Sequence, residues 1–279
     1  PHAFHYEQIL AGLESGCHVL VEKPMVNTVA EAREVVRRTE ASGTIVSVSY
    51  QRRYWPVVRC MRDVVASGRI GEVQFVQALQ NQNWYLRQLQ ANRWRINRAV
   101  SGGGQLNDSG SHLLDILLFV TGLAVDSVYC RQQSFTLDVD VNSALSLEFS
   151  NGALGSVAIV GHAPGYGGQV WEDITIYGTQ GAFYYRQLGQ PFGPPEAPQR
   201  ERKIELRLHE GDQEVPLGEL PAGGDPDYTF VEAILGRATV ACTPRDGLRV
   251  AELTEAAFRS AETEERVRVE HADVLPSSA

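Results

Sequence analysis

Long apolar runs and paired cysteines are missing from this 279-residue chain, and each absence excludes a class of protein. No apolar stretch approaches the roughly 20 residues that a membrane-spanning helix needs. The four cysteines stand singly, without a C-x-x-C pair, which favours reduced thiols in a cytoplasmic protein over disulfides or a zinc site. We therefore expect a cytoplasmic globular protein without a membrane partner.

Positive charge is also scarce, because 25 basic residues face 34 acidic ones and the net charge is −9. Binding to a phosphate backbone needs a basic surface, so we expect no nucleic-acid partner. Only Lys23 and Lys203 are lysine, and every other basic residue is arginine. A lysine ammonium has a pKa that its surroundings can tune, which singles out Lys23 as a functional candidate. An ordinary surface lysine is the alternative.

The first 50 residues alternate between helix and strand. Such alternation implies parallel strands, whose carboxyl ends carry the functional loops, and Lys23 and Gln51 both lie at such ends. Because fifty residues are too few to cover both faces of a parallel sheet, we expect a further N-terminal portion before Pro1. The predicted elements are a helix over 2–15, a strand over Cys17–Val21, a helix from the Thr28–Glu31 capping box to Ser42, and a strand over Thr44–Tyr50.

From residue 71 onward, apolar residues alternate with polar ones, as in a sheet with one buried face. The predicted strands are Val73–Gln82, Val125–Thr136, Val141–Phe149, Ala153–Val160, Val170–Tyr177, Ala182–Arg186 and Val267–Glu270. The predicted helices are Pro56–Ser67, 105–121, Pro226–Leu235 and Arg245–Glu262, and 189–200 is a predicted loop. We thus expect an α/β portion over 1–50, an α+β domain with a large, mainly antiparallel sheet and flanking helices over 51–271, and a tail over 272–279.

The segment Gly102–Asp115 joins a run of glycines to an apolar helix that carries a polar stripe. Asp108, His112 and Asp115 follow at spacings of four and three, so on a helix they share one face. Burying such a stripe is costly unless it lines a cavity, and a histidine beside a carboxylate suits proton transfer. A helix-capping Asp108 and a core histidine are the alternatives. We expect no metal, because no further His or Cys is spaced to complete a site.

Several segments, taken in order, resemble the signatures of the Gfo/Idh/MocA oxidoreductase family, which includes glucose–fructose oxidoreductase and inositol dehydrogenase. The E-K-P triplet at residues 22–24 alone is weak evidence for this resemblance. Its occurrence in order with the longer motif G-G-G-x-L-x-D-x-G-x-H-x-x-D is strong evidence. One departure is His2, which stands where the family usually has Asn. The matching segments are Pro1–His5, Gly16–Pro24, Val48–Tyr54, Trp94-Arg95, Gly102–Asp115, Phe149–Ala153, Ile176–Gly181 and Thr243–Gly247.

The resemblance implies a Rossmann domain, of which residues 1–50 would be the last part, followed by a substrate domain on a large open sheet. The outer face of that sheet would form a homodimer or homotetramer. NAD or NADP is the implied cofactor. No G-x-G-x-x-G turn, which cradles the pyrophosphate, occurs among the 26 glycines, so we expect it upstream. The chain as given is not expected to bind either nucleotide well.

The implied reaction is hydride transfer between the nicotinamide and a secondary alcohol carbon of a sugar, cyclitol or related polyol. By resemblance, His112 is the general acid/base, and Lys23 orients substrate and nicotinamide and supplies positive charge. Asp108 either orients the His112 imidazole or binds a substrate hydroxyl. The presence of Lys23, Asp108 and His112 together favours an enzyme. A binding or oligomerisation protein that has lost its cofactor, and an NAD-dependent glycosidase, are the alternatives.

The resemblance also suggests residues that contact substrate and cofactor. Trp94, Arg95 and Asp115 would bind substrate. The alternatives are a plain sheet-edge aromatic for Trp94, a structural ion pair for Arg95, and a supporting or buried hydrogen bond for Asp115. A cis Lys23–Pro24 bond is expected. The residues that would border the nicotinamide are His2, His5, Glu22, Lys23, Pro24 and Gln51, and the departure at His2 leaves that contact open.

Overall fold

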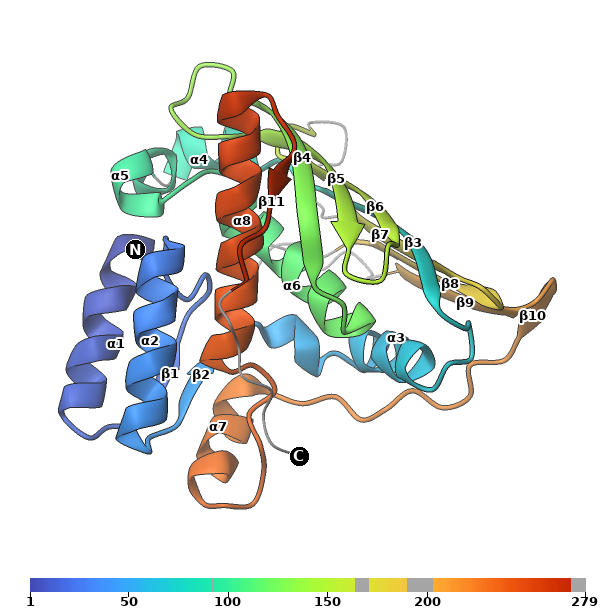
Figure 1. Cartoon of the computed structure of the whole chain (residues 1–279), viewed down its shortest axis with the longest axis horizontal. Helices are drawn as coiled ribbons and strands as arrows, with labels where there is room; N and C mark the ends of the chain where they lie inside the picture. Colours follow the sequence, from blue (N-terminus) through green and yellow to red (C-terminus); the bar gives the residue numbers. More distant parts are fainter. Residues whose placement is uncertain (92, 164–170, 190–202, 272–279) are drawn as a thin grey trace.

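A two-stranded parallel sheet lies beside a nine-stranded sheet in the computed structural model, which describes residues 1–91, 93–163, 171–189 and 203–271 (Figure 1). Within these ranges, no helix combines the length and the apolar character needed to cross a membrane. The predicted loop over 189–200, after its first residue, and the predicted tail over 272–279 lie outside the described residues.

The first 50 residues form the expected strand–helix–strand unit. A 3₁₀ turn at His2–Phe4 leads into α1 (His5–Glu14), followed by β1 (Val19–Val21), α2 (Val29–Ser42) and β2 (Val46–Val48). Helix α2 begins at the predicted capping box, in which Thr28 and Glu31 bond each other's backbone amides. β1 and β2 are parallel, so their carboxyl ends lie at the same edge.

The large sheet is mainly antiparallel, as predicted, and only β3 and β6 pair in parallel within it. Its strands run in the order β10-β9-β8-β7-β3-β6-β5-β4-β11. Their bounds are β3 (Val73–Asn81), β4 (Val125–Gln133), β5 (Asn142–Phe149), β6 (Leu154–Val160), β7 (Trp171–Gly178), β8 (Gly181–Leu188), β9 (Lys203–Glu210), β10 (Gln213–Val215) and β11 (Val267–Arg268). Strands β9 and β10 were not predicted from the sequence.

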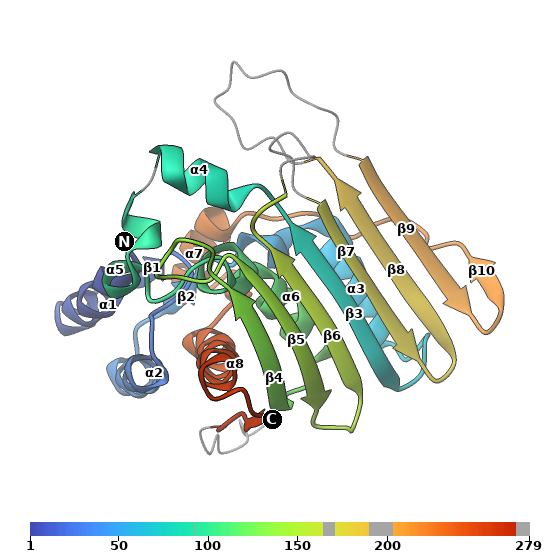
Figure 2. The ribbon, with the colours of Figure 1, turned by 90° about the horizontal axis from the view of Figure 1, so that it is seen from above.

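Helices cover one face of this sheet and leave the other face bare (Figure 2). Helix α6 is central to the covered face, and all of its residues except the half-buried Phe119 are buried. Helix α8 packs on α2 and on β4, and thereby joins the small sheet to the large one. The bounds are α3 (Pro56–Ala66), α4 (Trp84–Ala91), α5 (Arg98–Ser101), α6 (Ser111–Thr121), α7 (Pro226–Ile234) and α8 (Pro244–Thr263). Helices α4 and α5 were not predicted.

Candidate functional site

The glycine-rich segment enters α6 through a tight approach to the chain before β5. A Cβ on Gly104 would lie 1.8 Å from the carbonyl oxygen of Asp140. The Asp140 carboxylate accepts hydrogen bonds from the amides of Gly104 and Leu106, both at 2.7 Å. The chain then forms a π-helical turn over Leu106–Gly110 before α6 begins at Ser111. The predicted helix over 105–121 is therefore not α-helical in its first turn.

The Asp108 carboxylate, which lies in this turn, accepts hydrogen bonds from two side chains and forms an ion pair with a third. Its Oδ1 is 3.2 Å from the Lys23 Nζ, and its Oδ2 accepts from the Trp84 indole at 2.8 Å and lies 3.1 Å from the Arg95 Nε. Burial alone would raise the pKa of this carboxyl, but the Lys23 and Arg95 charges outweigh burial and hold the pKa far below its usual range. Asp108 is therefore an ionised anchor for two cations, and its carboxylate does not cap the helix.

The predicted Trp94-Arg95 pair lies against this anchor. The Arg95 guanidinium sits 4.2 Å from the centre of the Trp94 ring, and the His2 ring meets that indole edge-on at 4.9 Å. The His2 Nδ1 donates to the carbonyl oxygen of Ser101 at 2.9 Å. Burial lowers the pKa of His2 to about 4, so its imidazole is neutral at pH 7. The structure thus brings Trp94, Arg95 and His2 together with Lys23 and Asp108.

His112 lies in the first turn of α6 and is only 6% exposed. Its ring meets Tyr50 edge-on at 5.7 Å, and its Nδ1 is buried without a hydrogen-bond partner among the described residues. Burial, reinforced by the Lys23 and Arg52 charges, lowers the pKa of His112 well below 6.5. The imidazole is therefore neutral and ready to accept a proton, which is the state that a general base needs.

The carboxyl ends of β1 and β2 carry the residues predicted to border a nicotinamide. The Lys23–Pro24 peptide bond is cis, as expected, and the Pro24 carbonyl accepts from the His5 Nδ1 at 2.9 Å. Glu22 accepts from the Lys23 amide at 3.2 Å, and the side chains of Glu22 and Gln51 are exposed. Open α/β sheets bind their ligands at this edge, so these residues fit a dinucleotide cofactor.

Asp115 is not brought into this cluster. Its carboxylate pairs with Arg53, whose Nη2 is 2.6 Å from Oδ1, and Arg53 also lies 3.1 Å from Asp246. Burial raises the pKa of Asp115 to about 6, and the Arg53 charge opposes this shift. The structure therefore favours the buried hydrogen bond that was the alternative to substrate contact.

Two side chains of the candidate site, Trp84 and Asp140, had little or no signal in the sequence. Trp84 binds Asp108 from a helix that was not predicted, and no spacing connects the two residues. Asp140, which fixes the glycine segment, stands just before a predicted strand, where a carboxylate between two valines was the only hint. No three His, Cys, Asp or Glu side chains in the described ranges gather as metal ligands would.

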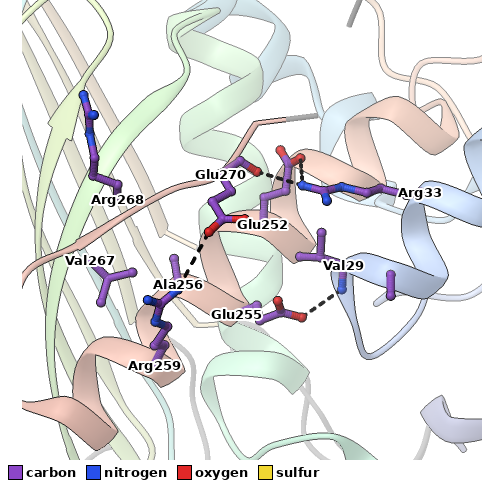
Figure 3. Close-up of a pocket in the computed structure, with 10 residues that line it drawn as sticks. Val29, Arg33, Glu252, Glu255, Ala256, Arg259, Val267, Arg268 and Glu270 are labelled. Carbon is purple, nitrogen blue, oxygen red and sulfur yellow. Dashed lines mark hydrogen bonds and ion pairs between the residues drawn. The ribbon is translucent and has the colours of Figure 1, made fainter. Parts of the chain in front are cut away.

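A separate hollow lies between α2, α8 and β11 (Figure 3). Its charged groups satisfy one another, because Arg33 lies 4.0 Å from Glu252 and Arg259 lies 3.8 Å from Glu270. Glu255 accepts from the amide of Val29, at the start of α2, at 2.9 Å. These contacts attach α2 to α8, and we assign the hollow a structural role.

Two family models match the chain. The model described as "Oxidoreductase family, NAD-binding Rossmann fold" matches residues 1–50, and the model described as "GFO/IDH/MocA C-terminal domain" matches residues 58–184. The first match ends two residues after β2, and the second begins at residue 58, within α3.

Dehydrogenases of sugars are among the similar proteins. D-glucoside 3-dehydrogenase of Escherichia coli is 35% identical over 131 residues, which are 46% of this chain and 36% of that protein. Levoglucosan dehydrogenase of Pseudarthrobacter phenanthrenivorans is 24% identical over 307 residues, which cover 96% of this chain and 78% of that protein. A solved structure of levoglucosan dehydrogenase in complex with NADH shares the fold, with a TM-score of 0.77 at 24% identity over 98% of this chain and 78% of that one.

Proposed function

This chain belongs to the Gfo/Idh/MocA oxidoreductase family, and we propose that it carries the catalytic side chains of an NAD(P)-dependent dehydrogenase. Its substrate is a sugar, a cyclitol or a related polyol, oxidised at a secondary alcohol. NAD or NADP supplies the hydride acceptor when bound. One observation carries the proposal above all, namely the buried and neutral His112 beside the Lys23–Asp108 ion pair.

In this proposal His112 accepts the proton of the reacting hydroxyl, and Lys23 stabilises the negative charge that develops on its oxygen. A neutral imidazole with an unpaired, buried nitrogen can take the proton without first losing one. An ammonium held 3.2 Å from Asp108 is fixed in place before the reaction begins, which is how a charged group stabilises a transition state without reorganising.

Asp108 acts as a positioning residue in this proposal. Its low pKa excludes it as a base near neutral pH. The carboxylate pairs with both Lys23 and Arg95 and accepts from the Trp84 indole, and it thereby fixes the two cations relative to each other. Trp94 and Arg95 then line the substrate side of the site, and Asp115 supports Arg53 from behind.

We propose that the cofactor lies along the carboxyl ends of β1 and β2. There the exposed Glu22 and Gln51 and the half-buried His5 would hold its nicotinamide end, together with Lys23 and Pro24. His2 would contribute through its packing on Trp94, because its buried ring already donates to Ser101. Residues 1–50 would belong to the dinucleotide-binding domain, and residues 51–271 to the substrate domain.

We also propose a cytoplasmic protein that associates through the bare face of its large sheet. The four cysteines are free thiols, as a reducing compartment allows. Apolar side chains are exposed on the bare face, among them Leu154, Tyr129 and Tyr177. A second copy would cover them in a homodimer or homotetramer.

The test of the catalytic proposal is the variant His112→Ala in the full-length protein. Reduction of NAD or NADP would be followed spectroscopically with glucosides, levoglucosan and inositols as substrates. Loss of the base should lower kcat by about 10²–10⁴-fold with a smaller change in KM. The wild-type kcat/KM should hold its plateau to below pH 6.5 and fall at lower pH, where the base is protonated.

His209→Ala is the matched control, because this histidine lies on β9, next to the edge strand β10 of the large sheet, and pairs with Glu214. It should keep wild-type kinetics. Normal turnover by His112→Ala, with its fold intact, would contradict the assignment of the base.

A further inference from the structure

A buried polar group that the proposed mechanism does not use lies on the covered face of the large sheet. Gln80 of β3 and Glu172 of β7 stand opposite each other in register, and they are 0% and 1% exposed. The Glu172 Oε2 accepts from the Gln80 Nε2 at 3.2 Å and from the Arg52 guanidinium. A single carboxylate oxygen therefore takes both of these hydrogen bonds.

The two remaining oxygens of this group have nothing to accept from. The Glu172 Oε1 and the Gln80 Oε1 are buried without a hydrogen-bond partner in the part of the chain that the structure describes. Leaving a buried acceptor unpaired costs about 1–3 kcal/mol, so proteins rarely tolerate two side by side. Two such acceptors on neighbouring strands indicate a place for a donor that comes from outside the chain.

Contacts through Arg52 connect this group to the candidate base. Arg52 follows Tyr50 by two residues, and the Tyr50 ring contacts the ring of His112. Arg52 is also close enough to His112 for its charge to lower the pKa of the imidazole. Arg52 therefore connects the unpaired oxygens to the surroundings of His112, where the reacting hydroxyl would lie.

We propose that Glu172 and Gln80 bind a second hydroxyl group of the polyol that His112 deprotonates, and that Arg52 is the positioning residue that holds the Glu172 carboxylate for it. The inference rests on the proposed function for the reacting hydroxyl. Both free atoms are acceptors, so they bind a group that donates a proton. A hydroxymethyl or ring hydroxyl does so, whereas a carboxylate at the same place has no proton to give and is repelled. The site therefore selects neutral sugars and cyclitols over sugar acids.

Calorimetric binding to the full-length protein tests this selection without requiring turnover. The neutral probes are methyl glucoside and scyllo-inositol, and the charged probe is methyl glucuronide, which differs from the glucoside by a carboxylate in place of a hydroxymethyl group. Gln80→Met keeps the volume and removes the free acceptor, so the Kd of the neutral probe should rise about ten-fold. Glu172→Gln offers an amide donor, so the preference for glucoside over glucuronide should shrink at least ten-fold.

Asp173→Asn is the matched control. Asp173 is the next residue of β7, faces the bare side of the sheet and pairs there with Arg186 at 2.9 Å. Its variant should bind all three probes as the wild type does. Because Glu172→Gln leaves Arg52 without its partner, the double variant Arg52→Gln/Glu172→Gln repeats the measurement with the buried charge removed.

Several outcomes overturn the inference: a wild type that binds neither neutral probe, a wild type that prefers the glucuronide, or folded Gln80 and Glu172 variants with unchanged Kd values and preference. A wild type that binds the neutral probes with the expected preference but reduces no NAD or NADP contradicts the proposed function alone. The binding preference, together with its loss in the variants, would still support the acceptor site.

Discussion

At the scale of single residues, the Asp108 carboxylate holds the candidate site together. Its three partners come from the end of β1, from α4 and from the turn after α4, so segments far apart in the sequence meet at one side chain. A buried carboxylate without cations would be protonated or destabilising, and a buried Lys23 without an anion would be equally costly. The negative charge of Asp108 and the positive charge of Lys23 therefore each lower the free-energy cost of burying the other.

His2 gives a residue-scale prediction about pH. Its pKa is about 4 in the folded protein and near 6.5 in an unfolded chain, so the unfolded state binds more protons between these values. The stability that neutral His2 contributes is fully present above pH 6.5 and is lost as the pH falls through 6 and 5 toward 4, by an amount of the order of a few kcal/mol. Urea unfolding at several pH values measures this loss.

The variant His2→Asn should flatten that pH dependence. An asparagine amide can still donate to the Ser101 carbonyl, but it does not titrate in this range. An unchanged slope in His2→Asn would show that other groups govern acid stability.

Sequence motifs alone pointed to Lys23, Asp108 and His112 as candidates, because a family motif is recognised from residues that follow one another in a fixed order. They could not identify the partners. Trp84 reaches Asp108 only because α4 folds over the site, and Arg53 reaches Asp115 only because the 3₁₀ turn after β2 packs on α6. Such pairings depend on tertiary geometry, and no local spacing encodes them.

At the scale of elements, the path of the chain into α6 decides where the site residues lie. A π-helical turn contains more residues per turn than an α-helix, so it shifts Asp108 relative to the stripe that an ideal helix would give. Asp140 holds the amides at the start of this turn, and the Gly104 backbone lies directly on the Asp140 backbone. The first turn is therefore set by a contact between two segments rather than by local propensity.

Gly104→Ala should consequently be far more harmful than a glycine replacement elsewhere. Its Cβ would overlap the backbone of Asp140, which cannot move without releasing two hydrogen bonds, so the free energy of unfolding should fall by roughly 3 kcal/mol or more. Urea denaturation measures the change, and kcat reports the displacement of Asp108.

Gly122→Ala is the comparison at the other end of the same helix. Gly122 has a φ of 69° and open space where a Cβ would lie, so its replacement should cost only about 1 kcal/mol. Equal losses in the two variants would show that the close approach to Asp140 does not require glycine at 104, where the backbone φ is not left-handed.

Most elements followed from periodicity and capping, and the exceptions have physical reasons. In β9, Ile204, Leu206 and Leu208 alternate with charged residues, so its signal was present beside the proline-rich segment that precedes it. β10 is three residues long and exists only through pairing with β9. Helix α4 is only eight residues long, and its Trp84 packs with Val139 and Val141 from a distant segment, so contacts that hold it are not visible in the local sequence.

At the scale of the whole molecule, the large sheet is covered on one face only. The bare face carries Leu154 on β6, which is 53% exposed, with the Phe75 and Glu148 positions as its neighbours in register. A broad sheet face with exposed apolar side chains suits association with a second copy.

Leu154→Arg should therefore shift the protein toward the monomer. In the proposed interface a guanidinium would have to be desolvated, which is unfavourable, so light scattering after size-exclusion chromatography should show a smaller mass. Tyr228→Arg on α7 is the control, since Tyr228 is 68% exposed but lies away from the sheet. A full-size oligomer of Leu154→Arg would place the interface elsewhere.

Helix α8 has a consequence for how the molecule is made. The Ser47 hydroxyl and the Val48 amide both donate to the carbonyl of Cys242, which is 195 residues beyond Ser47, and α8 then packs on α2. The contact between the first 50 residues and the large-sheet domain is therefore complete only after residues 242–263 have been synthesised, because the groups that meet across it lie nearly two hundred residues apart.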